Sequence, residues 1–394
     1  MKTLPKGFKD SDIGPIPQDW EVKMLSHVCS MQSGQTITAK KIGFTGNYPC
    51  YGGNGFRGYT QTYTHDGVFP IIGRQGALCG NTKLAIGKFY ASEHAVVVTC
   101  NQKANPIWLY YTLGSMNLNQ YAEATAQPGL AVSKIMRQYI PLPLLPEQQA
   151  IADALSDIDA LIGAQEELLA KKRAIKQGAM QELLTGRRRL PGFPVRPMKQ
   201  TDIGPIPEDW EVKELNEICS MQSGQAITAK DIDDTGTFPC YGGNGLRGYT
   251  KTYTHDGMFP LIGRQGALCG NTKFATGKFY ASEHTVVVSC MTNTSPLWLY
   301  YMLDRMNLNQ YAEASAQPGL AVSKIMRQYI AYPCVSEQAA IAAVLSDMDA
   351  EITAVEEELA KHRALKRGMM QELLSGRIRL PYKKSTHKKQ NAGE

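Results

Sequence analysis

The chain has 394 residues, of which 43% are hydrophobic and 20% charged, with a formal net charge of +6. This length suits two or three domains, and the composition excludes a largely disordered chain. The charge is compatible with nucleic acid but is weaker than that of a domain that binds by charge alone. The sequence has no run of about 18 apolar residues and its N-terminal stretch lacks an apolar core, so we expect a cytoplasmic protein without a membrane span.

The dominant feature is an internal repeat. The stretch YGGNGFRGYTQTYTHDGVFPIIGRQGALCGNTK (51–83) returns as YGGNGLRGYTKTYTHDGMFPLIGRQGALCGNTK (241–273), an offset of 190 residues. The same offset relates DIGPIPQDW (12–20) to DIGPIPEDW (202–210) and holds along nearly the whole chain. A repeat of this length predicts a duplicated domain rather than a solenoid.

The first part of each copy reads as mixed and loop-rich. In chain order, the glycine-rich YGGNG (51–55) predicts a loop, FYASEHAVVVTC (89–100) predicts a strand, and PIWLYYTLGSMNLNQY (106–121) predicts a helix. Eight of the nine cysteines match by the offset, Cys334 is left over, and no CxxC occurs. This pattern indicates reduced thiols.

The second part of each copy predicts a long helix. Residues 146–185 contain no proline after Pro146, which suits a first helical turn, and Ser336 suits an N-cap in the second copy. Gly186 and Gly376 follow as stop signals. In the second copy the apolar residues follow the 4-3-4-3-4 spacing of a coiled-coil seam: Ile341, Leu345, Met348, Ile352, Val355 and Leu359.

A helix of this length would be roughly 60 Å long and needs a partner for its narrow seam. The helix of the other copy can fold back antiparallel through the connection 187–209. Gly178 and Gly368 interrupt the pattern, since a glycine within a helix costs about 1 kcal/mol relative to alanine. They permit a close approach of helices or of a bound protein, or are tolerated kinks; the sequence leaves these alternatives open.

Catalytic motifs are missing. The sequence contains no Asn/Asp-Pro-Pro-aromatic methyltransferase motif, no Walker A, no HExxH and no GxSxG. His65, His94 and Cys79 recur as His255, His284 and Cys269, which makes a metal site conceivable, but their spacing fits no common zinc pattern. We therefore expect no catalytic residues, no metal and no cofactor on this chain, which favours a recognition or scaffold protein over an enzyme.

The repeated polar stretch contains side chains of the kinds that read DNA. Arginine reads guanine and asparagine or glutamine reads adenine through two hydrogen bonds, whereas lysine meets phosphates. An ordinary solvated loop is the alternative for any single residue. The candidate DNA-binding residues are Tyr51, Asn54, Arg57, Tyr59, Arg74, Gln75, Asn81 and Lys83, with Tyr241, Asn244, Arg247, Tyr249, Arg264, Gln265, Asn271 and Lys273 in the second copy.

These motifs together resemble the specificity subunit of type I restriction–modification systems. The resemblance rests on DIGPIPxDWEV, YGGNGxRGY, IGRQGALCG, the PEQQAIADALSDIDALI helix start and QELLTGRRRLPGF, and it covers essentially the whole chain. The second copy departs from the pattern at AYPCVSEQAAIA (331–342), where the proline-rich run is missing.

The resemblance implies an α+β fold of two tandem target-recognition domains separated by two long antiparallel helices with pseudo-two-fold symmetry. The expected boundaries are 1–145 and 210–335 for the recognition domains, 146–186 and 336–376 for the helices, 187–209 for the linker and 377–394 for a basic tail. It further implies a chain without catalytic activity and, as partners, double-stranded DNA, two methyltransferase subunits and two restriction subunits. S-adenosylmethionine, ATP and Mg²⁺ are then expected on the partner subunits.

The near-identity of the two copies adds a prediction about the DNA. Each domain of such a protein would read one half of a bipartite site, and equal domains related by an antiparallel helix pair would read an interrupted palindrome. Two other classes of function remain open: a standalone sequence-specific binder such as a repressor, and a coiled-coil scaffold with protein-binding heads. A gel shift with the chain alone separates the first of these from the specificity subunit.

Overall fold

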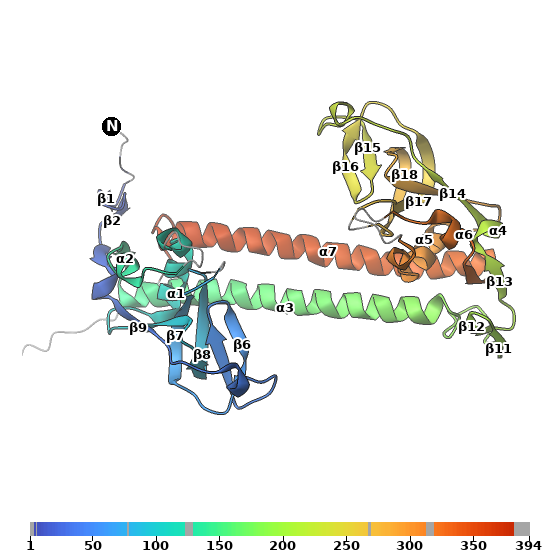
Figure 1. Ribbon diagram of the computed structural model, residues 1–394. Coiled ribbons are helices and arrows are strands. Elements are labelled where there is room, and N and C mark those ends of the chain that lie inside the picture. Colours follow the sequence, from blue (N-terminus) through green and yellow to red (C-terminus); the bar gives the residue numbers. More distant parts are fainter. Residues whose placement is uncertain are drawn as a thin grey trace, which may run out of the picture. The chain divides into compact units, whose positions relative to one another are not determined.

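The computed structural model describes residues 4, 6–76, 79–122, 129–266, 269–312 and 319–381. The expected basic tail therefore lies outside the described residues from 382 onward. The chain forms two compact units: Met1–Glu166 with Glu358–Glu394, the first unit, and Glu167–Glu357, the second unit. Each unit contains one copy of the mixed domain and a part of both long helices (Figure 1).

The domain of the first unit is built on a six-stranded mixed sheet in the order β4-β9-β7-β8-β5-β6. Its neighbouring strands are antiparallel except β5 and β8, which run parallel. The strands are β1 Phe8–Lys9, β2 Ile16–Pro17, β3 Glu21–Met24, β4 Cys29–Ser33, β5 Tyr48–Gly52, β6 Gly55–Thr60, β7 His65–Gly73, β8 Thr82–Ala91, β9 Ala95–Cys100 and β10 Tyr139–Leu142. The helices are α1 Pro106–Ser115 and α2 Val132–Met136.

The domain of the second unit repeats this arrangement, with a six-stranded sheet in the order β14-β19-β17-β18-β15-β16. Its strands are β11 Met198–Thr201, β12 Gly204–Pro207, β13 Glu211–Glu214, β14 Cys219–Ser223, β15 Phe238–Gly242, β16 Gly245–Thr250, β17 His255–Gly263, β18 Thr272–Ala281, β19 Thr285–Cys290 and β20 Tyr329–Tyr332. Its helices are α4 Leu215–Ile218, α5 Pro296–Arg305 and α6 Val322–Met326. The α+β class predicted from the sequence is confirmed.

Two local predictions need correction. The strand predicted over 89–100 is two strands, β8 and β9, because the chain turns at 92–94. The helix predicted over 106–121 ends at Ser115, and a separate 3-10 helix covers Leu118–Tyr121. Asn117 adopts a left-handed conformation between them, with φ of 51°, which ends the α-helix because asparagine tolerates this region better than most residues.

The long helices are α3, Leu145–Leu183, and α7, Val335–Leu374. Pro146 lies in the first turn of α3 as predicted. The prediction of Ser336 as an N-cap is wrong: the Cys334 carbonyl accepts the first helical hydrogen bonds, from the amides of Glu337 and Gln338, so Cys334 holds the cap position. The predicted seam is confirmed by the burial of its members, with relative exposures of 1% at Ile341 and 0% at Leu345.

Within each unit, α3 and α7 pack antiparallel. In the first unit, Asp159 pairs with Lys366 and Glu166 pairs with Arg363. In the second unit, Lys176 pairs with Asp349 at 2.5 Å and Arg173 pairs with Glu356. In these pairs the residue number rises along α3 as it falls along α7, so the two helices run antiparallel within each unit. The first unit thus joins the beginning of α3 to the end of α7, and the second unit joins the end of α3 to the beginning of α7.

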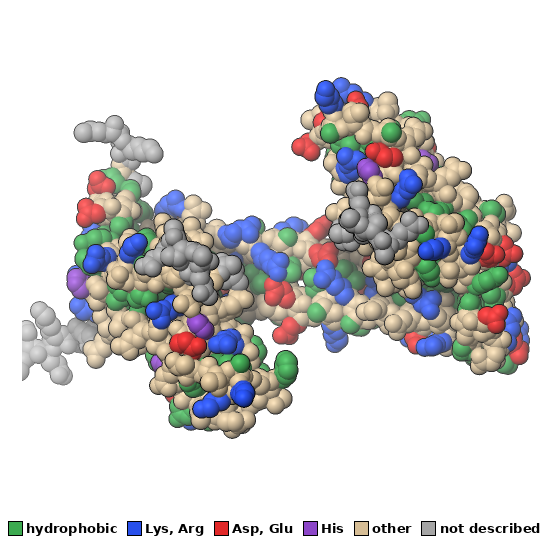
Figure 2. All heavy atoms as spheres, in the orientation of Figure 1, with side chains coloured by type: hydrophobic (Ala, Val, Ile, Leu, Met, Phe, Trp, Pro, Cys, Tyr) green, Lys and Arg blue, Asp and Glu red, His purple; other side chains and the backbone are tan. Residues whose placement is uncertain are grey.

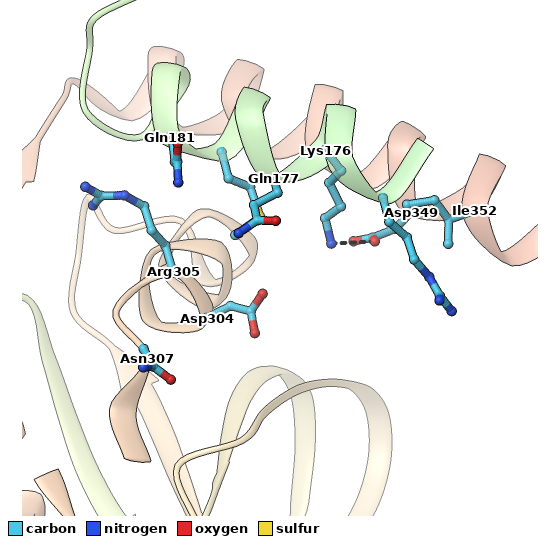
Figure 3. A pocket seen from close by; sticks show the side chains of 10 residues that line it. Lys176, Gln177, Gln181, Asp304, Arg305, Asn307, Asp349 and Ile352 are labelled. Atoms are coloured by element: carbon cyan, nitrogen blue, oxygen red, sulfur yellow. Dashed lines mark hydrogen bonds and ion pairs between the residues drawn. The ribbon is translucent and has the colours of Figure 1, made fainter. Parts of the chain in front are cut away.

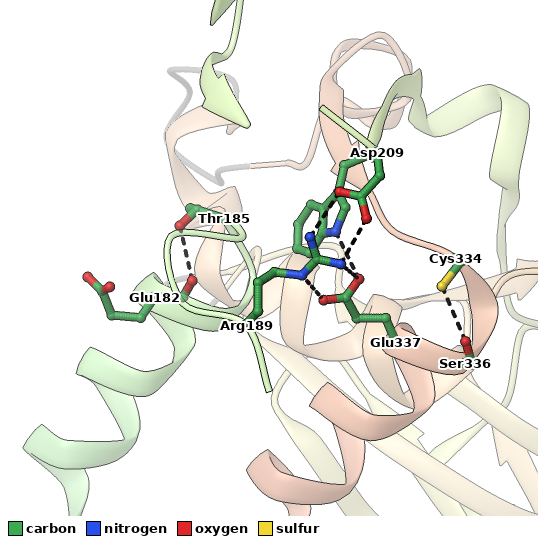
Figure 4. Close-up of polar contacts among 8 residues, drawn as sticks. Glu182, Thr185, Arg189, Asp209, Cys334, Ser336 and Glu337 are labelled. Carbon is green, nitrogen blue, oxygen red and sulfur yellow. Dashed lines mark hydrogen bonds and ion pairs between the residues drawn. The ribbon is translucent and has the colours of Figure 1, made fainter. Parts of the chain in front are cut away.

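An ionic cluster around a buried glutamate attaches each domain to its helices; Figure 4 shows that of the second unit. In the second unit Arg189 donates to both carboxylate oxygens of Glu337, in α7, and to both oxygens of Asp209. The indole Nε1 of Trp210 donates to the same Glu337 at 2.9 Å. In the first unit the corresponding residues, Arg379, Glu147, Asp19 and Trp20, make the same contacts. The Asp-Trp pair, the glutamate and the arginine that recur in the sequence thus form the same ionic cluster in both units.

Gly178 and Gly368 lie on exposed turns of the long helices. Apart from the adjacent residues and the backbone of the same helix, no described heavy atom lies within 4 Å of a Cβ built at either position. A close approach of another helix therefore does not explain these glycines. We expect Gly178→Ala and Gly368→Ala each to stabilise the protein by about 1 kcal/mol, since alanine has the higher helix propensity. Thermal unfolding of the single variants measures this. A loss of stability would contradict the open surroundings of these glycines.

All nine cysteines lie in the described residues and are free thiols. Burial raises the pKa of the Cys29, Cys100, Cys219 and Cys290 thiols to about 12, whereas Cys334 is exposed. Because the thiolate is the reactive form, we expect one fast-reacting thiol at pH 8. Labelling of the native protein with a chromogenic disulfide should lose its fast phase in Cys334→Ser; a fast phase that persists would contradict the assignment.

No helix among the described residues is long and apolar enough to cross a membrane.

Candidate nucleic-acid interface

A site that explains the duplication must occur in both copies. The second unit has a cavity of about 610 Å³ between side chains of α3, α5 and α7 (Figure 3). Its Asp304 and Arg305 correspond to Gly114 and Ser115 in the first copy. The lining of this cavity is therefore specific to one copy, whereas the polar stretch 51–83 is present in both.

The turn between β5 and β6 carries the first group of candidate residues. Asn54 lies at the turn, and Arg57 and Tyr59 lie on β6, the edge strand; all three are exposed. Tyr51 in β5 is half-buried with its ring 5.7 Å from that of Phe89, and burial raises the pKa of its hydroxyl. Tyr51 thus belongs to the packing below the surface, whereas the other three present their side chains to solvent.

Two glycines bring this turn against the next loop. A Cβ on Gly53 would lie 3.0 Å from the carbonyl oxygen of Gln75 and 3.3 Å from that of His94. A Cβ on Gly52 would lie 2.2 Å from Cδ of Arg57, so the stem of this arginine packs over the bare glycine. The loop predicted over 51–55 is instead a hairpin, since β5 ends at Gly52 and β6 begins at Gly55, and its glycines let the turn, Gln75 and His94 lie together.

Arg74 combines a fixed backbone with a free side chain. Its amide donates to the His94 carbonyl at 2.9 Å, and its carbonyl accepts from Leu130 at 2.8 Å. The neighbouring Gln75 forms a backbone bridge with Gly129. The Arg74 guanidinium is exposed and has no hydrogen bond or ion pair with another described residue. Its side chain therefore does not tie down the glycine turn.

Asn81 and Lys83 complete the group. The Asn81 carbonyl accepts a hydrogen bond from Gly73 at 2.9 Å, which places it beside the loop of Arg74. A Cβ on Gly55 would lie 3.5 Å from Cε of Lys83, so this side chain runs beside the β5–β6 turn. Asn81 and Lys83 also line a cavity of about 230 Å³ together with Asn117.

The second copy repeats this arrangement. Tyr241, Asn244, Asn271 and Lys273 line one small pocket. The Gln265 Oε1 lies 2.9 Å from Nδ1 of His284, which orients its amide. Arg247 packs over Gly242 as Arg57 does over Gly52, and Arg264 follows β17 as Arg74 follows β7. Both copies therefore bring together the predicted residues from two hairpins and one loop.

Tyr59 and Tyr249 lie further along the edge strand from the turn than the rest of this group. Tyr59 exchanges backbone hydrogen bonds with Gly43, and Tyr249 does so with Asp233. Tyr59 lines a different cavity, of about 550 Å³, at the outer edge of the sheet. The candidate surface thus has a second part, formed where the loop before β5 meets β6, which the sequence did not indicate.

His94 and His284, considered from the sequence only as conceivable metal ligands, lie within the candidate surface. The recurring His65 instead stacks on Phe89 with ring centroids 5.2 Å apart, and burial lowers its pKa. Among the described residues there is no group of three or more His, Cys, Asp or Glu side chains that could hold a metal. The backbone carbonyl of His94 accepts from the Arg74 amide, which places His94 beside the candidate surface, a position that the sequence could not reveal.

Charge is distributed rather than concentrated. On the face shown in Figure 2, basic and acidic side chains are interspersed over both domains, with no continuous basic field. Such a surface favours recognition by particular side chains over binding through bulk charge.

Comparison with known proteins adds independent information. A family model described as the type I restriction modification DNA specificity domain matches residues 17–171 and again 207–362. The type I restriction enzyme EcoprrI specificity subunit of Escherichia coli is 50% identical over 141 residues, which is 35% of this chain and 35% of that protein. The MjaVIII specificity subunit of Methanocaldococcus jannaschii is 25% identical over 95% of this chain and 96% of its own length.

A solved structure shares the fold. The crystal structure of the S subunit of a type I restriction–modification system from M. genitalium superposes with a TM-score of 0.71 at 16% identity, covering 94% of this chain and 97% of that one. This likeness extends over the domains and both long helices.

Proposed function

The chain belongs to the family of type I restriction–modification DNA specificity subunits, and on that premise we propose that each of its two copies reads one half of a bipartite site in double-stranded DNA. The family resemblance of the sequence is thereby confirmed. As a specificity subunit, the chain is a non-catalytic member of its restriction–modification complex.

One observation carries the proposal: both copies present the same polar side chains on the same hairpins and loop. All eight candidate positions of 51–83 have an identical residue in 241–273. Equal surfaces read equal bases, at about 1–3 kcal/mol for each good bidentate pair. Within each unit α3 and α7 run antiparallel, as expected for two copies that would read opposite strands of the duplex. We therefore propose that the site is an interrupted palindrome.

The partners follow from the same proposal. Two methyltransferase subunits and two restriction subunits dock on the long helices and domains, and they carry S-adenosylmethionine, ATP and Mg²⁺. Exposed Gly178 and Gly368, with open space around them, are suitable points for such a protein to approach α3 and α7.

Mapping of methylated bases in cells that express the chain with its modification partner tests the palindrome. We expect one half-site, a non-specific gap and the same half-site inverted. Cells that lack the gene for this chain are the control and should lack that motif. Two unrelated half-sites would overturn the palindrome while leaving the specificity function in place.

A standalone DNA-binding protein is the second candidate, because the recognition residues lie on this chain. A gel shift of the purified chain alone separates the two: the specificity subunit should gain affinity for its site when the modification partner is added, whereas a repressor-like protein binds equally well without it.

A further inference from the structure

The two copies differ most in charge at the loop before the β5–β6 hairpin. This loop reads KKIGFTGN (40–47) in the first copy and KDIDDTGT (230–237) in the second. The first version has two lysines and no carboxylate, whereas the second has one lysine and three aspartates. The polar residues next to this loop are the same in both copies apart from Gln61 and Thr36, which are Lys251 and Ala226 in the second copy.

The loop of the first copy places an aromatic ring in solvent. Phe44 is fully exposed, with a relative exposure of 101%, and Asp234 stands at the matching position. The loop is held beside β6, because Gly43 donates to the Tyr59 carbonyl at 3.0 Å and accepts from the Tyr59 amide at 2.8 Å. Phe44 therefore extends the edge of the candidate interface, next to a candidate DNA-binding residue.

The surroundings of the loop are suited to an anion in one copy only. In the first copy, Lys40 and Lys41 are exposed and line the cavity of about 550 Å³ together with Tyr59 and hydroxyl and amide side chains of neighbouring residues. In the second copy, Asp231 and Asp233 line the corresponding cavity of about 360 Å³ together with Lys230 and Lys251, so that carboxylates offset the cations there. Carboxylates there repel phosphates, whereas the two lysines of the first copy attract them.

The aspartates of the second copy have local structural partners. Asp233 accepts hydrogen bonds from the amides of Thr235 and Gly236, and Asp231 accepts one from the Thr228 hydroxyl. These contacts hold the loop without any ligand. The second loop is therefore a closed local structure, while the first presents its cations and its ring outward.

We propose that the 40–47 loop of the first copy is an additional DNA contact that the second copy lacks, with Lys40 and Lys41 on the phosphates and Phe44 against the sugar or a base step. Cationic loops with an apolar wedge are a known way of holding deformed duplex DNA. The inference rests on the proposed function and deepens it. Both copies read the same half-site sequence, but the first copy makes additional contacts with the DNA. The protein–DNA complex is therefore asymmetric even on a palindromic site.

Site-specific photocrosslinking in the full chain with its modification partner tests this. A photoreactive phenylalanine analogue, p-benzoylphenylalanine, replaces Phe44 or, as matched control, Asp234; Asn54 and Asn244 are replaced in turn to report DNA binding itself. We expect DNA crosslinks at 44, 54 and 244 but not at 234.

DNA crosslinks at 54 or 244 with none at 44, or equal crosslinks at 44 and 234, overturn the inference alone. No DNA crosslink at any position counts against the proposed function as well, and a protein crosslink at 44 would assign the loop to a partner subunit.

The salt dependence of binding gives a second readout. Each lost phosphate contact lowers the slope of log affinity against log salt by about 0.9. Lys41→Asp, which copies the second loop, should lower the slope by at least this amount. Asp231→Asn is the control and should leave the slope unchanged, since the second loop is expected to lie off the DNA. An unchanged slope in Lys41→Asp would contradict the proposed contact.

Discussion

Arg189→Met is expected to destabilise the second unit by about 3–5 kcal/mol, because it leaves a buried carboxylate without its cation. The Arg189 side chain is 4% exposed and that of Glu337 is 1% exposed, so water cannot replace the lost contacts. Hydrogen exchange of the amides in 167–357 measures the change, and the accelerated exchange should spread over the domain and the adjoining turns of α7.

The same variant changes the response to acid. The hydrogen bond from Arg189 is the largest cause that holds the pKa of Asp209 below its usual range. A carboxylate with a lowered pKa contributes stability above its unfolded pKa of about 3.9, and this contribution is lost as the pH falls through the folded value. We therefore expect the wild-type second unit to lose stability below about pH 4, and Arg189→Met to lack this part of the acid dependence.

Two controls separate the missing charge from the missing packing. Arg189→Met with Glu337→Gln removes both charges and should recover a large part of the stability. Arg379→Met, in the first unit, should cost less than Arg189→Met, because the Arg379 side chain is 35% exposed and water can solvate what remains. If Arg189→Met alone exchanged as slowly as the wild type, the ionic cluster would not hold the domain to its helices.

Arg74→Ala is expected to lower the affinity for specific DNA by about 5- to 150-fold, which corresponds to the 1–3 kcal/mol of one bidentate contact to guanine. The backbone around Arg74 is fixed by its bonds to His94 and Leu130, and its guanidinium is free of described partners, so the side chain is available for a base. Titration of labelled duplexes that carry the mapped site measures the loss.

The duplication provides the matched control. Arg264→Ala should lower affinity by a similar factor, and each single variant should relax one half of the methylated motif only. Thermal stability should stay within about 0.5 kcal/mol of the wild type, as for other exposed substitutions. A motif and an affinity that both survive the double variant would show that these arginines do not read DNA.

The long helices could be predicted because their signal is periodic and local. The seam from Ile341 to Leu359 repeats at the coiled-coil spacing, and Pro146 and Gly186 mark the two ends of α3. The ends were less certain: the N-cap fell on Cys334 instead of Ser336, because the carbonyl that accepts the first helical bonds has no signal in side-chain chemistry. The break at Asn117 was missed because a single residue with positive φ ends a segment whose apolar pattern continues.

The sequence could predict which residues form the candidate site but not how they are arranged in space. The sequence supplied the arginines, amides and glycines of 51–83, and the hairpin brings Asn54 beside Lys83. Tyr59 was grouped with them although it belongs to the other end of β6. Its backbone pairing with Gly43 is a contact between segments that no local pattern encodes, and for the same reason Phe44 was not recognised as part of the surface.

The division of the chain has a consequence for its biosynthesis. The ionic cluster of the first unit needs Arg379, and its apolar core includes Leu373 and Leu374, whereas the second unit is one continuous segment, 167–357. On the ribosome, the domain translated first must wait for residues beyond 358, while the domain translated later already has all of its contacts. The order of translation and the order of completion are therefore reversed, and a ribosome that stops shortly after residue 357 releases a finished second unit attached to an unfinished first one.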